Sequence, residues 1–429
     1  MKNKIFNKII GYNEIKETLS RIIDVIKNPE KYEKLGATIP HGLLLHGEPG
    51  TGKTTFSNEI INYLGRKTYT IRKTKSDGDF INHINKIFEE AISNQPSIVF
   101  LDDIDKYAED DDCSNNEEFV TIQSLIDSIK DKDIFVIATA NDINLLPKSL
   151  LRSGRFDNII EIGNPTEEDT YEICKYYLGS KKIAYDVNFK NISSILTSAT
   201  CADLEKICNH AALYAGYKNK EKIGMSELID ASLEFIYNTN KVNTKKDDKY
   251  SLNIAYHEAG HALVGELLQP NSVSFVTVEN LNSESNKKGI TIYHKENDYF
   301  DDINHKIIRV KSLLAGKAAT EIVYNTCDVG SGSDLQRAFD IVEMFVGDYC
   351  QYGFDAWVQN HRELSEKVKT KKSDKIIELM NRYYQEVKEL LIKNREKLDI
   401  LAKELNKRKI LFQNDIEDIF NNPDKYKED

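Results

Sequence analysis

The stretch GLLLHGEPGTGKTT, residues 42–55, decides the fold of the first part of the chain. A short apolar run leads into a glycine-rich turn, and the residues after the turn have a helical pattern. GEPGTGKT (47–54) fits G-x-x-x-x-G-K-[ST], in which a strand, a phosphate-binding turn and a helix follow one another. The alternative is a glycine turn that binds nothing, and the expected strand and helix on either side disfavour it. The stretch therefore predicts a P-loop nucleotide site.

The residue types in this turn suit a nucleoside triphosphate with Mg²⁺. Gly50 and Gly52 let the backbone curl into a nest of N–H groups around phosphate oxygens. Lys53 is expected to reach the β- and γ-phosphates, and Thr54 to offer its hydroxyl to Mg²⁺. We assign ATP binding to the eight residues Gly47, Glu48, Pro49, Gly50, Thr51, Gly52, Lys53 and Thr54.

Two further apolar segments predict strands beside the first one. They are SIVFLDDID (97–105) and IFVIATAN (134–141). Buried strands that alternate with helical segments indicate a parallel sheet with helices on both faces, preceded here by a helical entry over residues 1 to about 36. Asp102 and Asp103 end the second strand, where an acid can hold the water shell of Mg²⁺. The alternative, two polar residues that merely end a strand, is disfavoured by the phosphate motif upstream.

The rest of the chain divides at a polar linker. A helical pattern runs from about residue 165 to 237, and NTNKVNTKKDDKY (238–250) has almost no large apolar residue. Beyond it, VSFVTV (273–278) and GITIYH (289–294) predict two strands of a small sheet. Apolar stripes at helical spacing predict helix packing near the C-terminus: Ile376, Met380, Tyr383, Val387 and Leu390, then Leu398, Leu401 and Leu405. The acidic stretch AEDDDCSNNEE (108–118) predicts a solvated loop.

Composition excludes several classes of protein. The 429 residues correspond to roughly three domains, and 40% apolar residues can build a core. A net charge of −11 offers no basic face, so we expect no nucleic-acid partner. There is no signal peptide and no run of 18 apolar residues, so we expect no membrane span in this chain. The cysteines form no C-x-x-C pair, which predicts free thiols in a reducing, cytoplasmic compartment: Cys113, Cys174, Cys201, Cys208, Cys327 and Cys350.

AYHEAGHALVGELL (255–268) predicts a metal site. On a helix, positions i and i+4 share a face, so His257 and His261 can direct two imidazoles at one Zn²⁺ ion. Glu258 is turned about 100° around the axis, where it can reach a water on the metal without binding the metal itself. Zn²⁺ lowers the pKa of such a water towards about 7, so that Glu258 can take its proton during attack on a peptide carbonyl.

A catalytic zinc site normally has a third protein ligand, and spacing alone leaves its identity open. Glu321, Asp328 and Asp334 are candidates. For Asp334 a purely structural alternative exists, because GSGSDLQRAF also fits an acid in the first turn of a helix, where it is favourable to the helix dipole.

VIATANDINLLPKSLLRSGRFD (136–157) resembles the second region of homology of AAA ATPases. By this resemblance Asn141 matches the polar sensor residue at the end of its strand. Arg152 and Arg155 match the two arginines that reach the ATP of a neighbouring subunit, although alone they could be surface charges. An arginine that stabilises the transferring phosphoryl group in trans implies a ring, usually a hexamer.

AYHEAGHALVG, LLAGKAATEIVY and DVGSGSDLQRAF together are similar to the peptidase domain of FtsH-type ATP-dependent zinc metalloproteases, and NREKLDILAKEL resembles their C-terminal helices. The resemblance spans about residues 5 to 420 and implies that Asp334 is the third ligand. It implies an α/β P-loop AAA+ ATPase domain with a helical lid, followed by a mainly α zinc-metallopeptidase domain. The expected boundaries are 1–164 (nucleotide-binding domain), 165–240 (lid), 241–250 (linker) and 251–429 (peptidase).

The sequence departs from this family in four places. Family members usually carry an N-terminal membrane anchor, so the chain either belongs to a member without one, or the protein is membrane-associated through an anchor missing here. Asp103 stands where the family has Glu, which predicts slow ATP hydrolysis. In RKTKSDGDFINH (72–83) the substrate-gripping loop is polar, with Ser76-Asp77-Gly78 at its tip and Phe80 the nearby aromatic residue. Cys201 replaces a lid glycine, and the sequence offers no interpretation of it.

These observations predict an ATP-dependent zinc endopeptidase that degrades polypeptides in a ring, with Zn²⁺, ATP and Mg²⁺ as cofactors. A substrate could add as a strand to the edge of GITIYH. One alternative is an ATP-dependent protein remodeller with a structural zinc domain, which the polar loop favours and Glu258 opposes. A second alternative is an ATP-gated peptidase without active threading.

Overall fold

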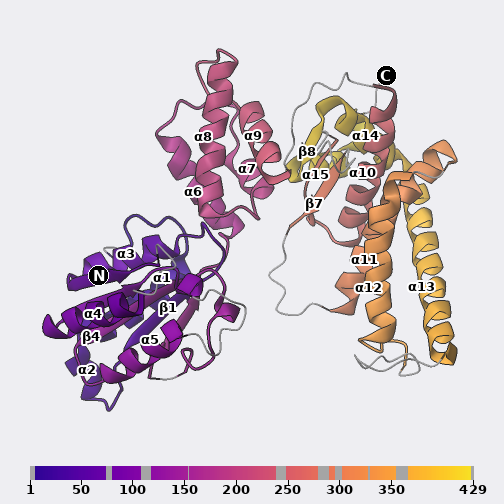
Figure 1. Cartoon of the computed structure of the whole chain (residues 1–429). Helices are drawn as coiled ribbons and strands as arrows, with labels where there is room; N and C mark the ends of the chain where they lie inside the picture. The colour runs from indigo at the N-terminus through magenta and orange to yellow at the C-terminus, as the bar shows by residue number, and fades with distance from the viewer. Residues whose placement is uncertain are drawn as a thin grey trace. The chain divides into compact units, whose positions relative to one another are not determined.

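The computed structural model describes residues 5–73, 80–107, 117–152, 154–237, 248–278, 289–294, 302–326, 329–353 and 366–426. The chain forms two compact units, Met1–Ala231 and Ser232–Asp429 (Figure 1). The predicted linker lies largely outside the described residues, and its last three positions already belong to a helix.

A parallel sheet forms the centre of the first unit. Its strand order is β2-β3-β4-β1-β5, and its strands are β1 (Gly42–His46), β2 (Lys67–Ile71), β3 (Ser97–Leu101), β4 (Ile134–Ala140) and β5 (Asn158–Glu161). The three predicted strands are confirmed, and each is almost wholly buried. The edge strands β2 and β5 were not predicted, because only two residues of β2 and none of β5 are buried, and neither strand is a continuous apolar run.

Helices cover both faces of this sheet, as predicted. They are α1 (Asn13–Lys27), α2 (Pro29–Glu33), α3 (Lys53–Leu64), α4 (Phe80–Ser93) and α5 (Glu117–Ser128), with 3₁₀ turns at Ile104–Tyr107 and Ile143–Leu145. On one face, α4 and α5 bury Phe88, Phe119 and Ile122 against the inner strands. On the other, α3 packs on β1 and β4, and Phe56 contacts Tyr12 edge to face.

The lid consists of α6 (Glu167–Gly179), α7 (Phe189–Ile195), α8 (Cys201–Tyr217) and α9 (Met225–Tyr237). Thr166 and Thr200 each cap the start of a helix with a capping box. The threonine side chain accepts a hydrogen bond from the backbone N–H three residues later, and the aspartate at that later position accepts one from the backbone N–H of the threonine. Asp169, the partner of Thr166, also accepts a hydrogen bond of 2.8 Å from the backbone N–H of Tyr12. The lid is thereby joined to the chain segment that precedes the sheet.

The second unit is mainly helical, as predicted, with the antiparallel sheet β7-β6-β8. Its elements are α10 (Asp248–Leu268), β6 (Val273–Thr277), β7 (Ile290–Tyr293), α11 (Ile303–Tyr324), α12 (Gly332–Gly347), α13 (Glu366–Lys393), α14 (Arg395–Arg408), β8 (Ile410–Phe412) and α15 (Gln413–Asn421), with 3₁₀ turns at Val329–Ser331 and Pro423–Tyr426. The helices α11, α12 and α13 pack side by side (Figure 1). β8 has three residues, too few to be recognised from sequence.

The C-terminal stripes lie on two helices. Leu398, Leu401 and Leu405 are buried on α14 as predicted. On α13 the buried residues are Ile376, Leu379, Tyr383, Val387 and Leu391. The prediction was wrong by one residue at two positions, because Met380 and Leu390 lie at the border of the stripe and are only partly buried.

Helices α10 and α11 approach each other closely because the residues between them are small. Gly260 on α10 lies against Ala315 and Ala319 on α11, and both alanines are fully buried. A Cβ atom on Gly260 would lie 2.6 Å from the carbonyl oxygen of Ala315, so only glycine fits there. This close approach lets the histidines of α10 reach the backbone of α11.

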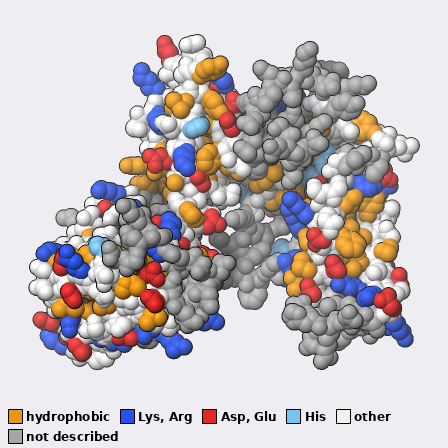
Figure 2. Space-filling model, viewed as in Figure 1, with side chains coloured by type: hydrophobic (Ala, Val, Ile, Leu, Met, Phe, Trp, Pro, Cys, Tyr) orange, Lys and Arg blue, Asp and Glu red, His pale blue; other side chains and the backbone are white. Residues whose placement is uncertain are grey.

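None of the helices within the described ranges combines the length and the apolar character that a bilayer-spanning segment needs. Cys174, Cys201, Cys208 and Cys350 are free thiols, and Cys113 and Cys327 lie outside the described residues. Figure 2 shows acidic and basic side chains interspersed over the surface in view.

Candidate metal centre and nucleotide site

Residues 255–266 of α10 are buried without interruption, although four of them are histidines or glutamates. Burying such groups is costly unless each has a partner. Glu266 has a structural one, because its carboxylate accepts hydrogen bonds from the backbone N–H groups of Asn271 and Val273 at 2.8 and 2.6 Å. The other three, His257, Glu258 and His261, gather at one place beside α11.

The two imidazoles meet a carboxylate from a distant part of the chain. The Nε2 atoms of His257 and His261 are 3.1 Å apart, and Oδ2 of Asp334 lies 3.4 and 3.3 Å from them. Ligand atoms about 2.0–2.2 Å from a tetrahedral Zn²⁺ ion are about 3.3–3.5 Å apart, so the three side chains fit this ion. Asp334 lies in the first turn of α12, so the structural and ligand interpretations of this residue are compatible.

The backbone of α11 orients the metal-binding nitrogens. The Nδ1–H of His261 can donate to the carbonyl oxygen of Ser312 at 2.6 Å, which leaves Nε2 free for a metal. Gly316 lies one turn further along α11. A Cβ atom at this position would lie 2.5 Å from Nε2 of His261 and 2.6 Å from Nε2 of His257. The absence of a side chain at 316 keeps this space open. Ser312 and Gly316 were not predicted as part of the site, because they belong to another helix than the two histidines.

Glu258 lies beside the three ligands and is not one of them. Burial raises the pKa of its carboxyl group, and the neighbouring histidines oppose that rise. The hydroxyl of Thr291 on β7 donates to Oε2 at 2.8 Å, and a Cβ atom on Gly289 would lie 2.7 Å from Cγ. A buried carboxylate that is held in one orientation and is easily protonated can act as a general base.

Of the other candidate ligands, Glu321 is bound elsewhere and Asp328 lies outside the described residues. Lys317 and Lys388 donate to the carboxylate of Glu321 at 3.0 and 2.9 Å, and the hydroxyl of Tyr384 donates to it as well. These bonds, above all that from Tyr384, lower the pKa of Glu321 to about 2. Glu321 therefore stabilises the packing of α11 on α13.

The P-loop connects β1 to α3, as predicted. Gly47, Gly50 and Gly52 have φ angles of 143°, 86° and 103°, which residues with a side chain rarely adopt. The ammonium group of Lys53 donates to the carbonyl oxygens of Gly47 and Glu48 at 2.7 and 2.8 Å. Burial lowers the pKa of Lys53.

The carboxyl ends of β1, β3 and β4 bring the predicted acids to the P-loop. Asp102 is buried and accepts a hydrogen bond of 2.8 Å from the hydroxyl of Thr139, while the hydroxyl of Thr54 lies 3.5 Å from its Oδ1. Thr139 in turn accepts from the backbone N–H of Asp103 at 2.9 Å. Asp103 has φ 53° and forms an ion pair of 2.7 Å with Lys106.

Arg72 also lies at this site, although it was not predicted from the sequence. Its guanidinium group lies 2.6 Å from Oδ2 of Asp102, the acid expected to hold the water shell of Mg²⁺. Arg72 follows β2, which was not recognised as a strand, so nothing in the sequence placed it beside β3.

The three residues matched to the AAA region differ in their surroundings. Asn141 follows β4 directly and is partly buried. Arg152 is exposed, and no hydrogen bond or ion pair of its side chain is found within the described ranges. Arg155 is held within the same chain, with its guanidinium group 2.7 Å from Asp127, whose pKa falls to about 2 mainly through this bond.

The structure shows the surroundings of Phe80 and Cys201, which belong to two of the segments where the sequence departs from the family. Ser76, Asp77 and Gly78 lie outside the described residues, but Phe80 begins α4 and is buried edge to face against Tyr107 with ring centroids 5.1 Å apart. Phe80 therefore belongs to the core. Cys201 lies beside the P-loop, with its Sγ 3.3 Å from the hydroxyl of Tyr12 and 3.7 Å from the carbonyl oxygen of Thr51.

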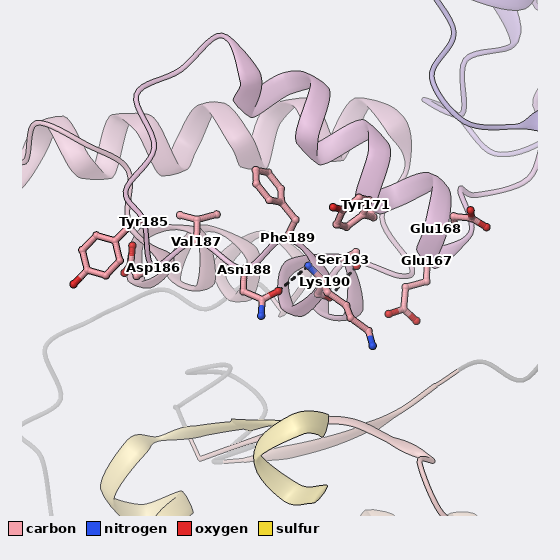
Figure 3. Close-up of a pocket in the computed structure, with 10 residues that line it drawn as sticks. All are labelled: Glu167, Glu168, Tyr171, Tyr185, Asp186, Val187, Asn188, Phe189, Lys190 and Ser193. Atoms are coloured by element: carbon pink, nitrogen blue, oxygen red, sulfur yellow. Dashed lines mark hydrogen bonds between the residues drawn. The ribbon is translucent and has the colours of Figure 1, made fainter. Parts of the chain in front are cut away.

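A separate hollow of about 850 Å³ lies in the lid, on α6 and α7 (Figure 3). Asn188, a polar residue of its wall, caps α7: its side chain accepts a hydrogen bond of 3.0 Å from the backbone N–H of Lys190. Tyr171 and Phe189 form its apolar part, with ring centroids 6.1 Å apart. No predicted site residue lines it.

Comparison with known proteins finds two domain families in this chain. The family described as ATPase family associated with various cellular activities (AAA) matches residues 43–164, and Peptidase family M41 matches residues 241–419. "ATP-dependent zinc metalloprotease FtsH 2" of Thermoanaerobacter sp. is 31% identical over 97% of this chain and 83% of its own length. FtsH of Helicobacter pylori is 29% identical over 95% and 69%, and FtsH 2 of Phytoplasma mali 30% over 97% and 63%. The chain therefore belongs to the FtsH-type ATP-dependent zinc metalloproteases, metalloendopeptidases in which an AAA ATPase domain precedes an M41 domain and whose cofactors are Zn²⁺ and ATP with Mg²⁺.

Proposed function

We propose that this protein degrades polypeptides at the centre formed by His257, His261 and Asp334, within a hexameric ring driven by ATP. The observation that carries the proposal is the convergence of three ligand atoms, all within 4.8 Å of one another, beside the buried carboxylate of Glu258. A purely structural zinc site has no use for a buried base, which argues against a remodeller with a structural zinc domain.

In the proposed reaction each residue has a defined task. Zn²⁺ held by the three ligands would polarise the peptide carbonyl and make a water molecule acidic enough to attack it. Glu258 takes the proton of that water and returns it to the leaving amine, because its carboxylate is buried and its pKa is raised. Thr291 orients Glu258, and Ser312 orients the imidazole of His261.

The open edge of β7 supports a binding mode for the polypeptide. In the sheet order β7-β6-β8, one side of β7 has no strand partner among the described residues. Thr291 and Tyr293 both point from β7 to α10, where the hydroxyl of Tyr293 donates to the carbonyl oxygen of His261 at 2.9 Å. A substrate paired with this edge would run past Glu258 in an extended conformation.

For ATP hydrolysis we propose that Gly47 to Thr54 bind the phosphates, that Asp102 holds the water shell of Mg²⁺ and that Asp103 orients the attacking water. Asn141 acts as the sensor, and Arg152 and Arg155 reach the ATP of the next subunit. The exposure of Arg152 suits this role. Arg155 has to exchange its ion pair with Asp127 for the phosphate. Asp103, one methylene shorter than Glu, makes hydrolysis slow.

A second candidate, an ATP-gated peptidase without active threading, is favoured by the burial of Phe80, which removes that ring from any substrate grip. In this version ATP controls assembly of the ring. We also propose the domain division 1–164, 165–240, 241–250 and 251–429, and a reducing compartment such as the cytoplasm, which the free thiols suit.

Degradation of casein tests the peptidase function. The comparison is between wild type and Glu258→Gln, with and without ATP, and with a zinc chelator. We expect cleavage by wild type alone, with zinc content and ATPase activity unchanged in Glu258→Gln. Cleavage that persists in Glu258→Gln and resists the chelator would overturn the proposal. Native mass spectrometry with ATP tests the ring, and Arg152→Ala should lose ATPase activity while retaining ATP binding.

A further inference from the structure

We propose that Thr139 is a positioning residue for ATP hydrolysis. Its buried hydroxyl group, anchored on Asp102, fixes the backbone at Asp103 and thereby the carboxylate that orients the attacking water. This role rests on the function proposed above for the two acids, and it names the residue that holds them. Thr139 lies near the end of β4 and is fully buried.

Alternation along β4 directs Thr139 toward the helix that follows the P-loop. Its neighbours on the strand, Ala138 and Ala140, belong to the core beneath α4 and α5. Successive side chains of a strand point to opposite faces of the sheet, so Thr139 points to the other face, where α3 packs on β4. Leu101 is paired with Ala138 in the parallel register, and Asp102 and Thr139 are the next residues along. The acid and the hydroxyl group therefore lie side by side on the face that carries α3.

The hydroxyl group of Thr139 bonds both acids at once. It donates its proton to Oδ1 of Asp102 at 2.8 Å, and its oxygen accepts from the backbone N–H of Asp103 at 2.9 Å. A hydroxyl group carries a single proton, so the donation to Asp102 leaves only lone pairs toward Asp103, and the two bonds are compatible. One buried atom thereby links the Asp102 carboxylate to the backbone at Asp103.

The bond to Asp103 is made where the chain leaves the sheet. The N–H of Asp102 still donates to the carbonyl oxygen of Ile71 on β2 at 3.0 Å, so the next N–H along the strand, that of Asp103, points toward β4. There the hydroxyl group of Thr139 accepts in place of a strand carbonyl. Asp103 has φ 53°, a left-handed conformation that persists only where the surroundings hold it. Loss of the hydroxyl group would leave this N–H without its acceptor and release the turn.

The ion pair of Asp103 is too exposed to fix this residue. Oδ2 of Asp103 lies 2.7 Å from the ammonium group of Lys106, whose side chain is 62% exposed. Exposed ion pairs contribute little and are screened by salt. Lys106 can leave the carboxylate when the attacking water binds there, whereas the buried hydroxyl group of Thr139 stays with the backbone. The position of Asp103 therefore depends on Thr139.

Removal of the hydroxyl group at nearly constant shape tests this role. Thr139→Val lacks both bonds. We expect its kcat for ATP hydrolysis at saturating Mg²⁺ to fall about tenfold or more, while the Kd for a fluorescent ATP analogue stays within about threefold, because only the orientation of a reactant is disturbed. Thr139→Ser keeps the hydroxyl group and should recover most of kcat. If Thr139→Val does not fold, Thr139→Ala takes its place with the same expected loss.

A double-mutant cycle with Asp103→Asn separates positioning from a general disturbance of the site. Thr139→Val should lower kcat of the Asp103→Asn protein by less than about threefold, because the carboxylate that Thr139 positions is already gone. The full tenfold loss in both backgrounds would overturn the inference. Lys106→Gln should lower kcat less than Thr139→Val does, and a larger loss would assign the position of Asp103 to the ion pair instead.

Hydrogen–deuterium exchange of the nucleotide-free chain gives a readout that does not depend on activity. The peptide that contains Asp103 should gain about one rapidly exchanging amide in Thr139→Val and none in Thr139→Ser. Thr170→Val is the matched control, because Thr170 on α6 is also fully buried and its hydroxyl group has no hydrogen-bond partner among the described residues. It should keep the wild-type kcat and exchange.

The outcomes distinguish this role from the proposed function. Either an unchanged kcat or an unchanged exchange in Thr139→Val would overturn the inference and leave the ATPase function intact. Wild-type kcat in Asp103→Asn, or no ATP hydrolysis by wild type, would overturn the proposed function itself.

Discussion

A methyl group at position 316 should disrupt zinc binding without a change in any ligand. In Gly316→Ala the new Cβ atom would lie 2.5 Å from Nε2 of His261 and 2.6 Å from Nε2 of His257. Real Cβ atoms essentially never approach another heavy atom below 3.0 Å, so the atoms must separate by at least 0.5 Å, the difference between 3.0 and 2.5 Å. Metal–ligand distances tolerate changes of about 0.2 Å.

Neither helix can move away easily. Gly260 already lets α10 contact the backbone of Ala315, and the Nδ1 of His261 is held 2.6 Å from the carbonyl oxygen of Ser312. The imidazoles must therefore rotate away from the metal. We expect Zn²⁺ affinity to fall at least 10–100-fold, the usual effect of disturbing the residues that orient metal ligands. Overpacking should also lower the free energy of unfolding by about 1–3 kcal/mol.

Zinc affinity is measured by competition with a chromophoric chelator, and the melting temperature is measured with and without Zn²⁺. Gly216→Ala is the control, because a Cβ atom there meets no atom within 4 Å and alanine favours the helix by up to about 1 kcal/mol. Gly216→Ala should bind Zn²⁺ like wild type. Affinity within twofold of wild type in a folded Gly316→Ala protein would refute the argument that the α11 backbone shapes the centre.

Four further predictions concern single side chains. Thr291→Val should lower kcat about tenfold with zinc content unchanged, and Thr291→Ser should recover most of it; equal rates for valine and threonine would show that this hydroxyl does not position Glu258. Asp103→Glu should hydrolyse ATP faster than wild type, and equal turnover would contradict the role given to the shorter acid. Arg72→Gln should lower the Mg²⁺ concentration for half-maximal ATPase activity about three- to tenfold, because Arg72 competes for Asp102; an unchanged Mg²⁺ dependence would count against that competition. Glu321→Gln should leave zinc affinity unchanged and lower stability at pH 7 by about 1 kcal/mol, a figure reduced from the pKa shift because the side chain is 31% exposed. The folded-state pKa of Glu321 is depressed to about 2 from 4.5, so this stability is present above about pH 4.5 and is lost as pH falls towards 2; urea titrations at pH 7, 5 and 4 should show a difference that begins to shrink below pH 5.

The parts of the fold that follow from sequence are those with a local pattern. The buried strands β1, β3 and β4 are continuous apolar runs that alternate with helical segments, and this pattern predicted them. β2 and β5 lie at the edges of the sheet, and their exposed alternate residues resemble loop sequence. The omission of β2 had a chemical consequence, because it concealed the position of Arg72 beside Asp102.

At the metal centre, too, only the residues that form a local sequence pattern could be predicted. One helix turn places His257, Glu258 and His261 together, so spacing predicts those three residues. Thr291, Ser312 and Gly316 come from β7 and α11, and their roles depend on how closely these elements pack on α10. Close packing depends in turn on the small residues between α10 and α11, which carry no chemical motif of their own.

The choice of the third ligand shows which features of a site built from distant residues can be recognised in the sequence. Glu321 and Asp334 are both carboxylates downstream of the motif, and spacing did not separate them. Lys317 precedes Glu321 by four residues on α11, so a competing cation was visible as an i, i+4 pair. A carboxylate that already accepts from an ammonium group is a poor candidate for a metal, whereas the nearest polar partners of Asp334 are the two imidazoles. Lys388 on α13 also forms an ion pair with Glu321, and the spacing of residues in the sequence could not predict this pair. Charge pairing within a helix could therefore have weakened the case for Glu321, but only the packing of α12 on α11 brings Asp334 to the histidines.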